Sequence, residues 1–270
     1  GVPVDLIDQV HGDTDATEDA GKSSASRQTF VSGNAAMLAG LDLRRSLAAM
    51  AGFPECAEAA ALPVLQIAGG SVILRTPAGE ERRLQLASLA ADHRGDLAVG
   101  SGTFNPPTVP LDENGQGVPY ATYGFAAQVA EVEVDLELGT VKPLHIYAAH
   151  DVGRAINPTL TEGQIHGGIA QGIGLALMEE YVSGRTDNLH DYLIPTAGDV
   201  PPITIWLVED PEPLGPYGAK GVGEPALVAT APAILNAVQM ATGVRLTDLP
   251  VTPARMRAAL VAAAAAVKQA

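Results

Sequence analysis

The chain has 270 residues, of which 47% are hydrophobic, and this is enough to build a substantial core. Its formal net charge of −15 at pH 7, with no run of Lys or Arg, argues against nucleic-acid binding, because phosphate backbones require clustered cations. The single cysteine, Cys56, excludes an internal disulfide and a cysteine-ligated iron–sulfur cluster within the chain, and it favours a cytoplasmic location.

The N-terminal part of the sequence predicts one helix and several short strands. Residues 4–10, "VDLIDQV", alternate loosely and predict a strand, whereas the small polar residues of 11–28 predict a loop. Helical spacing of apolar residues predicts a helix over 34–51. Residues 71–77 predict a strand, and 81–92 predict a strand followed by a short helix. Because the sequence opens in an extended segment, we expect it to be a portion of a larger protein.

The clearest β signal follows a long loop. Residues 101–120 are rich in Pro, Gly and Asn, and loops of this length in compact domains are usually functional or interfacial. Residues 123–153 then alternate, turn near Gly139 and return, which predicts a long hairpin. Its solvated face is marked by Glu131, Glu133 and Asp135.

The C-terminal part predicts three helices and one strand. The helices are expected over 160–182, 225–241 and 253–268, and the strand over 203–209. The most apolar run, "AALVAAAAAV", is too short to cross a bilayer, so no membrane span is predicted. A hairpin followed by a helix, a strand and two helices indicates an α+β fold with mixed or antiparallel sheets and packed helices.

Glycines interrupt the helical pattern of "TEGQIHGGIAQGIGLALMEE" (161–180). Each costs about 1 kcal/mol relative to alanine in a helix interior, so close approach of another backbone or of a ligand is the usual reason for it. Gln171 lies among them, and its amide can both donate and accept a hydrogen bond toward a heteroaromatic edge. Tight packing and cofactor contact both remain open from spacing alone.

Two further stretches carry polar side chains whose role the sequence leaves open. In "GKSSASRQT" (21–29) small residues allow backbone N–H groups to face an anion, and the Arg27 guanidinium can bind a phosphate through two hydrogen bonds. Loops of this composition are nevertheless usually just solvated. In "AHDVGRAINPTL" (149–160) His150 and Asp151 are adjacent, and adjacent strand residues point to opposite faces. A structural role at the turn is therefore favoured over a joint catalytic or metal site.

Glu224 stands alone between a glycine-rich stretch and an apolar helix in "YGAKGVGEPALVATAPAILNAV" (217–238). As a cap-region acid it would gain about 0.3–1 kcal/mol from the helix dipole, but Glu is not a preferred cap. The preceding glycines allow a bulky partner to come close. An apolar setting raises a carboxyl pKa and a helix terminus lowers it, so a base near neutral pH is the alternative.

Four stretches in this order resemble one family. They are "GDTDAT…GKSSASRQTFVSGNA", "AAHDVGRAINPTLTEGQIHGGIAQGIGLALMEE", "YLIPT" and "AKGVGEPAL". The ordered set is similar to the C-terminal part of the molybdenum-binding large subunit of the xanthine dehydrogenase/aldehyde oxidase family. The resemblance implies that residues 1–270 form the C-terminal portion of a molybdopterin-binding catalytic domain. We expect two subdomains, residues 1–120 with the C-terminal helices, and residues 121–215 with the hairpin and the glycine-rich helix.

The resemblance assigns roles to particular residues. Glu224 corresponds to the family's catalytic glutamate, the base in the insertion of water-derived oxygen into an electron-poor C–H bond of a purine, a nicotinate-like ring or an aldehyde. Gln171 corresponds to a glutamine that hydrogen-bonds the pterin. The expected cofactor-binding residues are Ser24, Ala25, Ser26, Arg27, Gln28, Gln171, Lys220, Gly221, Val222 and Gly223. The pterin holds the metal, so no side chain is expected to ligate molybdenum directly.

The same resemblance implies further cofactors and partners. Arg27 and the serines beside it resemble a bacterial variant in which the pterin is a cytosine dinucleotide. Iron–sulfur clusters and FAD would lie on partner chains: the remaining molybdenum domain, a two-cluster [2Fe–2S] subunit and a flavin subunit, paired as a dimer of heteromers. Two alternatives stay open, a non-catalytic cofactor-binding or assembly module of the same fold, and an acidic interaction domain without a cofactor.

Overall fold

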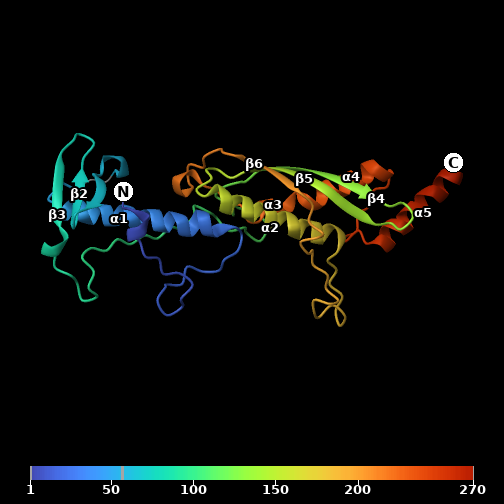
Figure 1. Ribbon diagram of the computed structural model, residues 1–270, viewed down its shortest axis with the longest axis horizontal. Helices are drawn as coiled ribbons and strands as arrows, with labels where there is room; N and C mark the ends of the chain where they lie inside the picture. Colours follow the sequence, from blue (N-terminus) through green and yellow to red (C-terminus); the bar gives the residue numbers. More distant parts are fainter. Residues whose placement is uncertain (1, 56–57, 270) are drawn as a thin grey trace. The chain divides into compact units, whose positions relative to one another are not determined.

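The computed structural model describes residues 2–55 and 58–269, so Gly1 and Cys56 lie outside the described part. The chain forms two compact units, Gly1–Pro107 and Thr108–Ala270, coloured from blue to green and from green to red in Figure 1. The expected subdomains placed the C-terminal helices with residues 1–120, whereas the structure groups those helices with the hairpin. How far the catalytic domain extends stays a prediction.

The first unit combines one long helix with a small antiparallel sheet. A π-helical turn, η2 (Gln28–Ser32), leads into α1 (Gly33–Met50), and short 3-10 turns η3 (Ala59–Ala61) and η4 (Leu86–Ser88) flank the sheet. The strands β1 (Val64–Ala68), β2 (Ser71–Arg75) and β3 (Glu81–Gln85) pair in that order. The core that joins helix and sheet contains Leu47, Ala48, Phe53, Val72 and Leu74.

Two predictions in the first unit were wrong. Residues 4–10 form no strand: η1 (Val4–Leu6) is a 3-10 turn, and Val4 and Val10 are 83% and 65% exposed. An alternating pattern becomes a strand only where a neighbouring strand pairs with it, and no described strand does so here. The sequence reading also missed β1, although Gly69-Gly70, both with positive φ, is a typical two-residue hairpin signal.

The second unit is a mixed three-stranded sheet covered on one face by helices. The predicted hairpin is confirmed as β4 (Ala126–Val134) and β5 (Val141–Asp151), with an irregularity between Glu131 and Val132. β6 (Ile203–Val208) pairs with β5 in parallel after the crossover through α2 (Pro158–Leu177). Ile146 and Ala148 point from β5 into a core shared with α2, α4 (Thr230–Thr242) and α5 (Pro253–Gln269).

Two predicted helices of this unit have different bounds in the structure. The helix expected over 160–182 ends at Leu177, because Glu179 and Glu180 turn away to contact the Tyr192 hydroxyl (2.7 Å) and Arg255 (2.5 Å). The helix expected over 225–241 is split at Ala229 into α3 (Pro225–Val228) and α4. Pro232 explains the split. Its nitrogen has no hydrogen to donate to the carbonyl of residue 228, and its ring clashes with that carbonyl.

One stretch in the described residues has the length and hydropathy of a membrane-spanning helix, namely Pro225–Thr242. The break at Ala229 interrupts it, and Ala226, Ala231 and Ile234 contribute buried side chains to the core of the second unit. A third of the stretch is buried in the structure, and a single helix of this length and composition is weak evidence for a membrane span.

The glycines of α2 divide into two groups. A Cβ added to Gly168 would lie 2.5 Å from the Ala226 Cβ, and one added to Gly172 would lie 2.3 Å from the Thr230 Cβ. These two glycines therefore allow α3 and the start of α4 to lie directly against α2. At Gly163 and Gly167 an added Cβ would meet nothing within 4 Å, so packing in this chain does not explain them.

We predict opposite effects for alanine at two adjacent positions. Gly168→Ala should lower the free energy of unfolding by about 1–3 kcal/mol, because the Ala226 backbone must move. Gly167→Ala should instead raise it by about 1 kcal/mol through helix propensity alone. Denaturant unfolding followed by the fluorescence of Trp206, the single tryptophan and a residue of this unit, measures both; equal effects would contradict the close contact.

Candidate functional site

Glu224 stands at the N-terminus of α3 as an exposed residue. Its backbone is already helical (φ −75°, ψ −40°), Pro225 follows as the first helical residue, and the Glu224 side chain makes no capping hydrogen bond to the helix. A cap accepts from the backbone N–H groups of the first turn, and this carboxylate does not. The cap interpretation that the sequence left open is therefore not supported by the geometry.

The segment that leads to Glu224 is fixed to the end of β5. Ala219 bridges Gly153, and the Lys220 N–H donates to the Val152 carbonyl at 3.1 Å. The Lys220 ammonium donates to the Asp151 carboxylate at 2.6 Å, with both side chains more than 90% buried. Gly153 has φ +65°, and a Cβ there would lie 2.3 Å from the Gly218 carbonyl oxygen, so only glycine permits this approach.

The segment that follows Glu224 is held by a partly buried amide. Gln128 on β4 donates from Nε2 to the Ala226 carbonyl at 3.0 Å, and its Oε1 accepts from the Thr230 hydroxyl at 2.7 Å. The same Nε2 lies 3.1 Å from His150 Nε2. Because an amide nitrogen has only donors, His150 Nε2 must be the acceptor, which places the imidazole proton on Nδ1.

His150 is a neutral histidine inside the protein. It is 1% exposed, and Nδ1 has no hydrogen-bond partner. Burial lowers the pKa of His150, because the charged imidazolium would lose its hydration. A charged ring would also present a proton to the Gln128 amide nitrogen, itself a donor. His150 thus contacts Gln128 and Asp151 contacts Lys220, as expected for a structural role of both residues at this turn.

Gln171 lies on the exposed face of α2, on the same side as Gly163 and Gly167, which are spaced four residues apart. With glycine at both positions, this part of the helix presents backbone and the Gln171 amide to its surroundings. Gly168 and Gly172, which face α3 and α4, lie three residues before and one residue after Gln171 in the helix.

The "SASRQ" loop belongs to the first unit and has an unusual backbone. Ala25 and Ser26 both adopt positive φ, 55° and 52°, which costs about 1–2 kcal/mol per non-glycine residue. The Arg27 Nη1 donates to the carbonyls of Ala20 and Lys22, and the Gln28 amide donates to the Ser23 hydroxyl at 2.7 Å. The Ser24 carbonyl accepts from the Arg27 N–H. These bonds hold the loop in one conformation.

The predicted site residues fall into two groups. Gln171 and the run from Lys220 to Glu224 belong to the second unit, and Ser24 to Gln28 belong to the first. Sequence reasoning missed Gln128 and Thr230, which support the Glu224 segment. A signal existed, since Gln128 is a polar residue at a strand position whose same-face neighbours, Ala130 and Val132, pack on the core.

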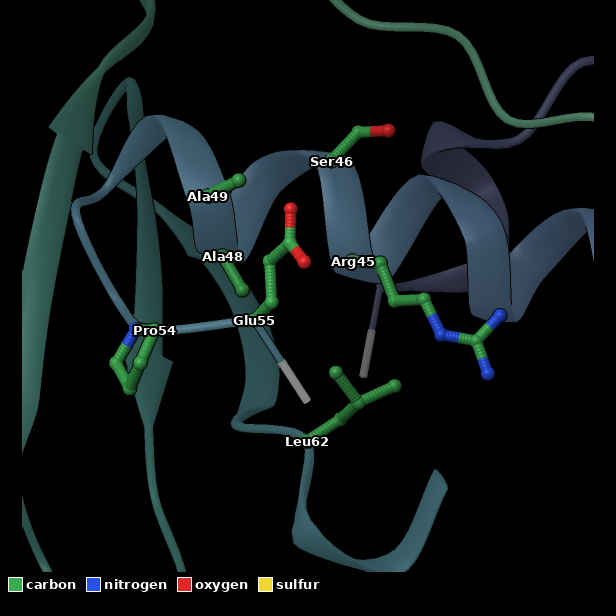
Figure 2. A pocket seen from close by; sticks show the side chains of 7 residues that line it. All are labelled: Arg45, Ser46, Ala48, Ala49, Pro54, Glu55 and Leu62. Atoms are coloured by element: carbon green, nitrogen blue, oxygen red, sulfur yellow. The ribbon is translucent and has the colours of Figure 1, made fainter. Parts of the chain in front are cut away.

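A separate pocket of about 540 Å³ lies in the first unit beside α1 (Figure 2). None of the predicted site residues lines it. Across residues 2–55 and 58–269, no group of three or more His, Cys, Asp or Glu side chains is placed to hold a metal ion. The pocket is lined by Arg45, Ser46, Ala48, Ala49, Pro54, Glu55 and Leu62.

Comparison with known proteins identifies the family of the chain. A family model described as the molybdopterin cofactor-binding domain matches residues 1–201. The chain belongs to this family. The expected resemblance to the molybdenum-binding subunits of xanthine dehydrogenases and aldehyde oxidases, and the α+β fold, are thereby confirmed.

Individual relatives show how much of such a protein the chain represents. It is 36% identical to the putative xanthine dehydrogenase molybdenum-binding subunit XdhA of Escherichia coli, over 95% of this chain and 34% of that protein. It is 33% identical to the 6-hydroxypseudooxynicotine dehydrogenase complex subunit gamma of Paenarthrobacter nicotinovorans, over 92% and 31%. The aldehyde oxidoreductase structure from Desulfovibrio gigas superposes with a TM-score of 0.72 at 29% identity, over 92% and 24%. The chain thus spans about a third or less of each.

The α2 face fits a flat pterin-type group. Gly163 and Gly167 leave space where any other residue would place a Cβ, and Gln171 offers a donor and an acceptor beside that space. Packing within the described residues requires neither glycine, and the open helix face is compatible with a bound molybdopterin.

The second unit should lose stability at mildly acidic pH through His150. The folded pKa lies below the ordinary value of 6.5, so the unfolded chain binds more protons. The stabilisation that neutral His150 contributes is complete above pH 6.5 and is lost as the pH falls through the lowered pKa of His150. Denaturant midpoints measured between pH 7.5 and 5 should fall less steeply for His150→Gln than for the unsubstituted chain.

The control is His93→Gln, because the His93 side chain is 82% exposed and should leave the pH dependence unchanged. If His150→Gln and His93→Gln gave the same pH dependence as the unsubstituted chain, neutral His150 would not support the fold.

Proposed function

We propose that the chain supplies the catalytic base, Glu224, of a molybdenum hydroxylase that inserts water-derived oxygen into an electron-poor C–H bond. The observation that carries the proposal is the setting of Glu224: an exposed carboxylate that does not cap its helix, on a segment anchored on both sides. A general base needs both an accessible carboxylate and a fixed position relative to the proton it removes. Glu224 has both.

The proposal keeps the cofactor roles that the family resemblance implies for individual residues. When bound, the molybdenum–pterin group supplies the two-electron oxidation chemistry. Gln171 hydrogen-bonds the pterin edge, and Glu224 accepts the proton of the attacking oxygen at its carboxylate. The stretch Lys220 to Gly223 shapes the approach, its Lys220 ammonium being engaged by Asp151. The loop from Ser24 to Gln28 lies against the pterin and its phosphate.

We infer further that the pterin is the cytosine dinucleotide form. The backbone of Ala25 and Ser26 is held in a left-handed turn conformation directly before Arg27. Arg27 adds a cation next to that loop, and its two carbonyl contacts set the direction of the guanidinium. An additional phosphate would suit this combination.

The remaining components belong to other segments or chains in this proposal. With one cysteine the chain cannot ligate an iron–sulfur cluster, so we propose a two-cluster [2Fe–2S] subunit, an FAD subunit and the rest of the molybdenum domain as partners, in a dimer of heteromers in the cytoplasm. The relative from Paenarthrobacter nicotinovorans is itself a subunit of a complex. Purines, N-heteroaromatic rings and aldehydes are the substrate classes proposed, in line with the names of the relatives.

Glu224→Gln tests the catalytic assignment. The amide keeps the shape of the side chain but cannot accept the proton, so turnover should be abolished in the assembled enzyme while molybdenum and pterin contents stay unchanged. The matched control is Glu133→Gln on the solvated face of β4, which should leave turnover unaffected. Near-normal turnover of Glu224→Gln with full cofactor would favour the alternative, a cofactor-binding or assembly module.

Gly167→Leu tests the pterin-binding face. A Cβ at this position meets no described atom within 4 Å, so folding should persist with leucine there while the pterin content of the assembled enzyme falls. Gly40→Leu is the control, because Gly40 is also an exposed helical glycine with nothing within 4 Å. Equal pterin contents in both variants would remove this face from the proposed site.

A further inference from the structure

The segment from Ala219 to Ala226 carries Glu224 and has almost no regular secondary structure of its own. Its position is therefore set by contacts with other elements. Upstream of Glu224 these are the Gly153–Ala219 bridge and the buried Asp151–Lys220 ion pair at 2.6 Å. Breaking such a pair leaves an uncompensated buried charge, so this side of the segment is held firmly.

Downstream of Glu224 the segment is held through one amide. Gln128 donates to the carbonyl of Ala226, which lies two residues after Glu224. The Thr230 hydroxyl donates to Gln128 Oε1 at 2.7 Å, and His150 Nε2 accepts the second N–H of the amide. Both amide protons and the amide oxygen are thus engaged, which fixes the rotation of the Gln128 amide and the direction of its bond to Ala226.

We propose that Gln128 is a positioning residue for Glu224, with Thr230 setting the orientation of the Gln128 amide. The inference rests on the proposed function of Glu224. Gln128 and Asp151 come from neighbouring strands of one sheet, β4 and β5, and contact the chain two residues after and four residues before Glu224. The sheet therefore sets where the carboxylate stands, and a displacement of about 1 Å can cost about 100-fold in rate.

The test is Gln128→Met in the assembled, cofactor-loaded enzyme. Methionine keeps the length of the side chain and removes all three hydrogen bonds. We expect kcat to fall by about 10- to 100-fold, with KM and pterin content nearly unchanged. Hydrogen exchange at residues 219–228 should accelerate while the rest of the second unit keeps its protection. The control, Thr204→Val, removes the contact of Thr204 with His145 (2.9 Å) in the same sheet and should leave kcat and the exchange of 219–228 unchanged.

A second pair of variants covers the case in which Gln128→Met does not assemble. Thr230→Val removes only the hydroxyl that orients the amide, and Thr230→Ser restores it. We expect a smaller fall in kcat for Thr230→Val, of about 3- to 10-fold for the loss of one net hydrogen bond, together with faster exchange at 219–228. Thr230→Ser should recover both values.

The outcomes separate the inference from the proposed function. Unchanged kcat in Gln128→Met, or in Thr230→Val where Gln128→Met does not assemble, would overturn the inference. So would a loss of kcat accompanied by equal loss of pterin and of protection throughout the second unit, since that pattern reports general destabilisation. If Glu224→Gln retained turnover, the proposed function itself would fail, whereas abolished turnover in Glu224→Gln with unchanged kcat in Gln128→Met rejects only the positioning role.

Discussion

The close contact of α2 with the α3–α4 segment is the constraint on which the second unit depends. It exists because Gly168 and Gly172 have no side chains at the points where Ala226 and Thr230 arrive. That contact buries Thr230 completely and brings the Ala226 carbonyl within reach of β4. Gln171, on the same helix, stays exposed. One helix thereby carries both the packing glycines and the residue proposed to contact the cofactor.

The polar interior beneath Glu224 follows from that packing. Burying Lys220, Asp151, His150 and Thr230 is unfavourable unless partners compensate for lost hydration. The ion pair and the Gln128 amide provide partners for most of these groups, and they do so between the sheet and an irregular segment. Buried polar networks of this kind hold a chain segment in one arrangement more firmly than apolar contacts, because an alternative arrangement would leave donors or acceptors unpaired.

Periodic patterns predicted much of the fold, and tertiary contacts account for the differences. Helix α1, the hairpin of β4 and β5, and the strands β2, β3 and β6 were visible in the sequence because each buries one face over several residues. Residues 4–10 alternate equally well but have no partner strand among the described residues, whereas the unpredicted β1 is paired with β2 across Gly69-Gly70. The early end of α2 reflects contacts of Glu179 and Glu180 with residues distant in sequence.

The sequence by itself determined the chemistry available: one candidate base in "GVGEPAL", an amide in "AQGIG", a small polar loop with Arg27, and too few cysteines for a cluster. These are properties of residue type and local order, and the family match to residues 1–201 includes "AQGIG" and the Arg27 loop. Only the tertiary structure decided which glycines of α2 pack and which stay open, that Glu224 does not cap its helix, and that Gln128 lies against Ala226. The glycine contacts and the Gln128 bond join residues 58 and 98 positions apart (168 to 226 and 128 to 226), and no local pattern encodes such meetings.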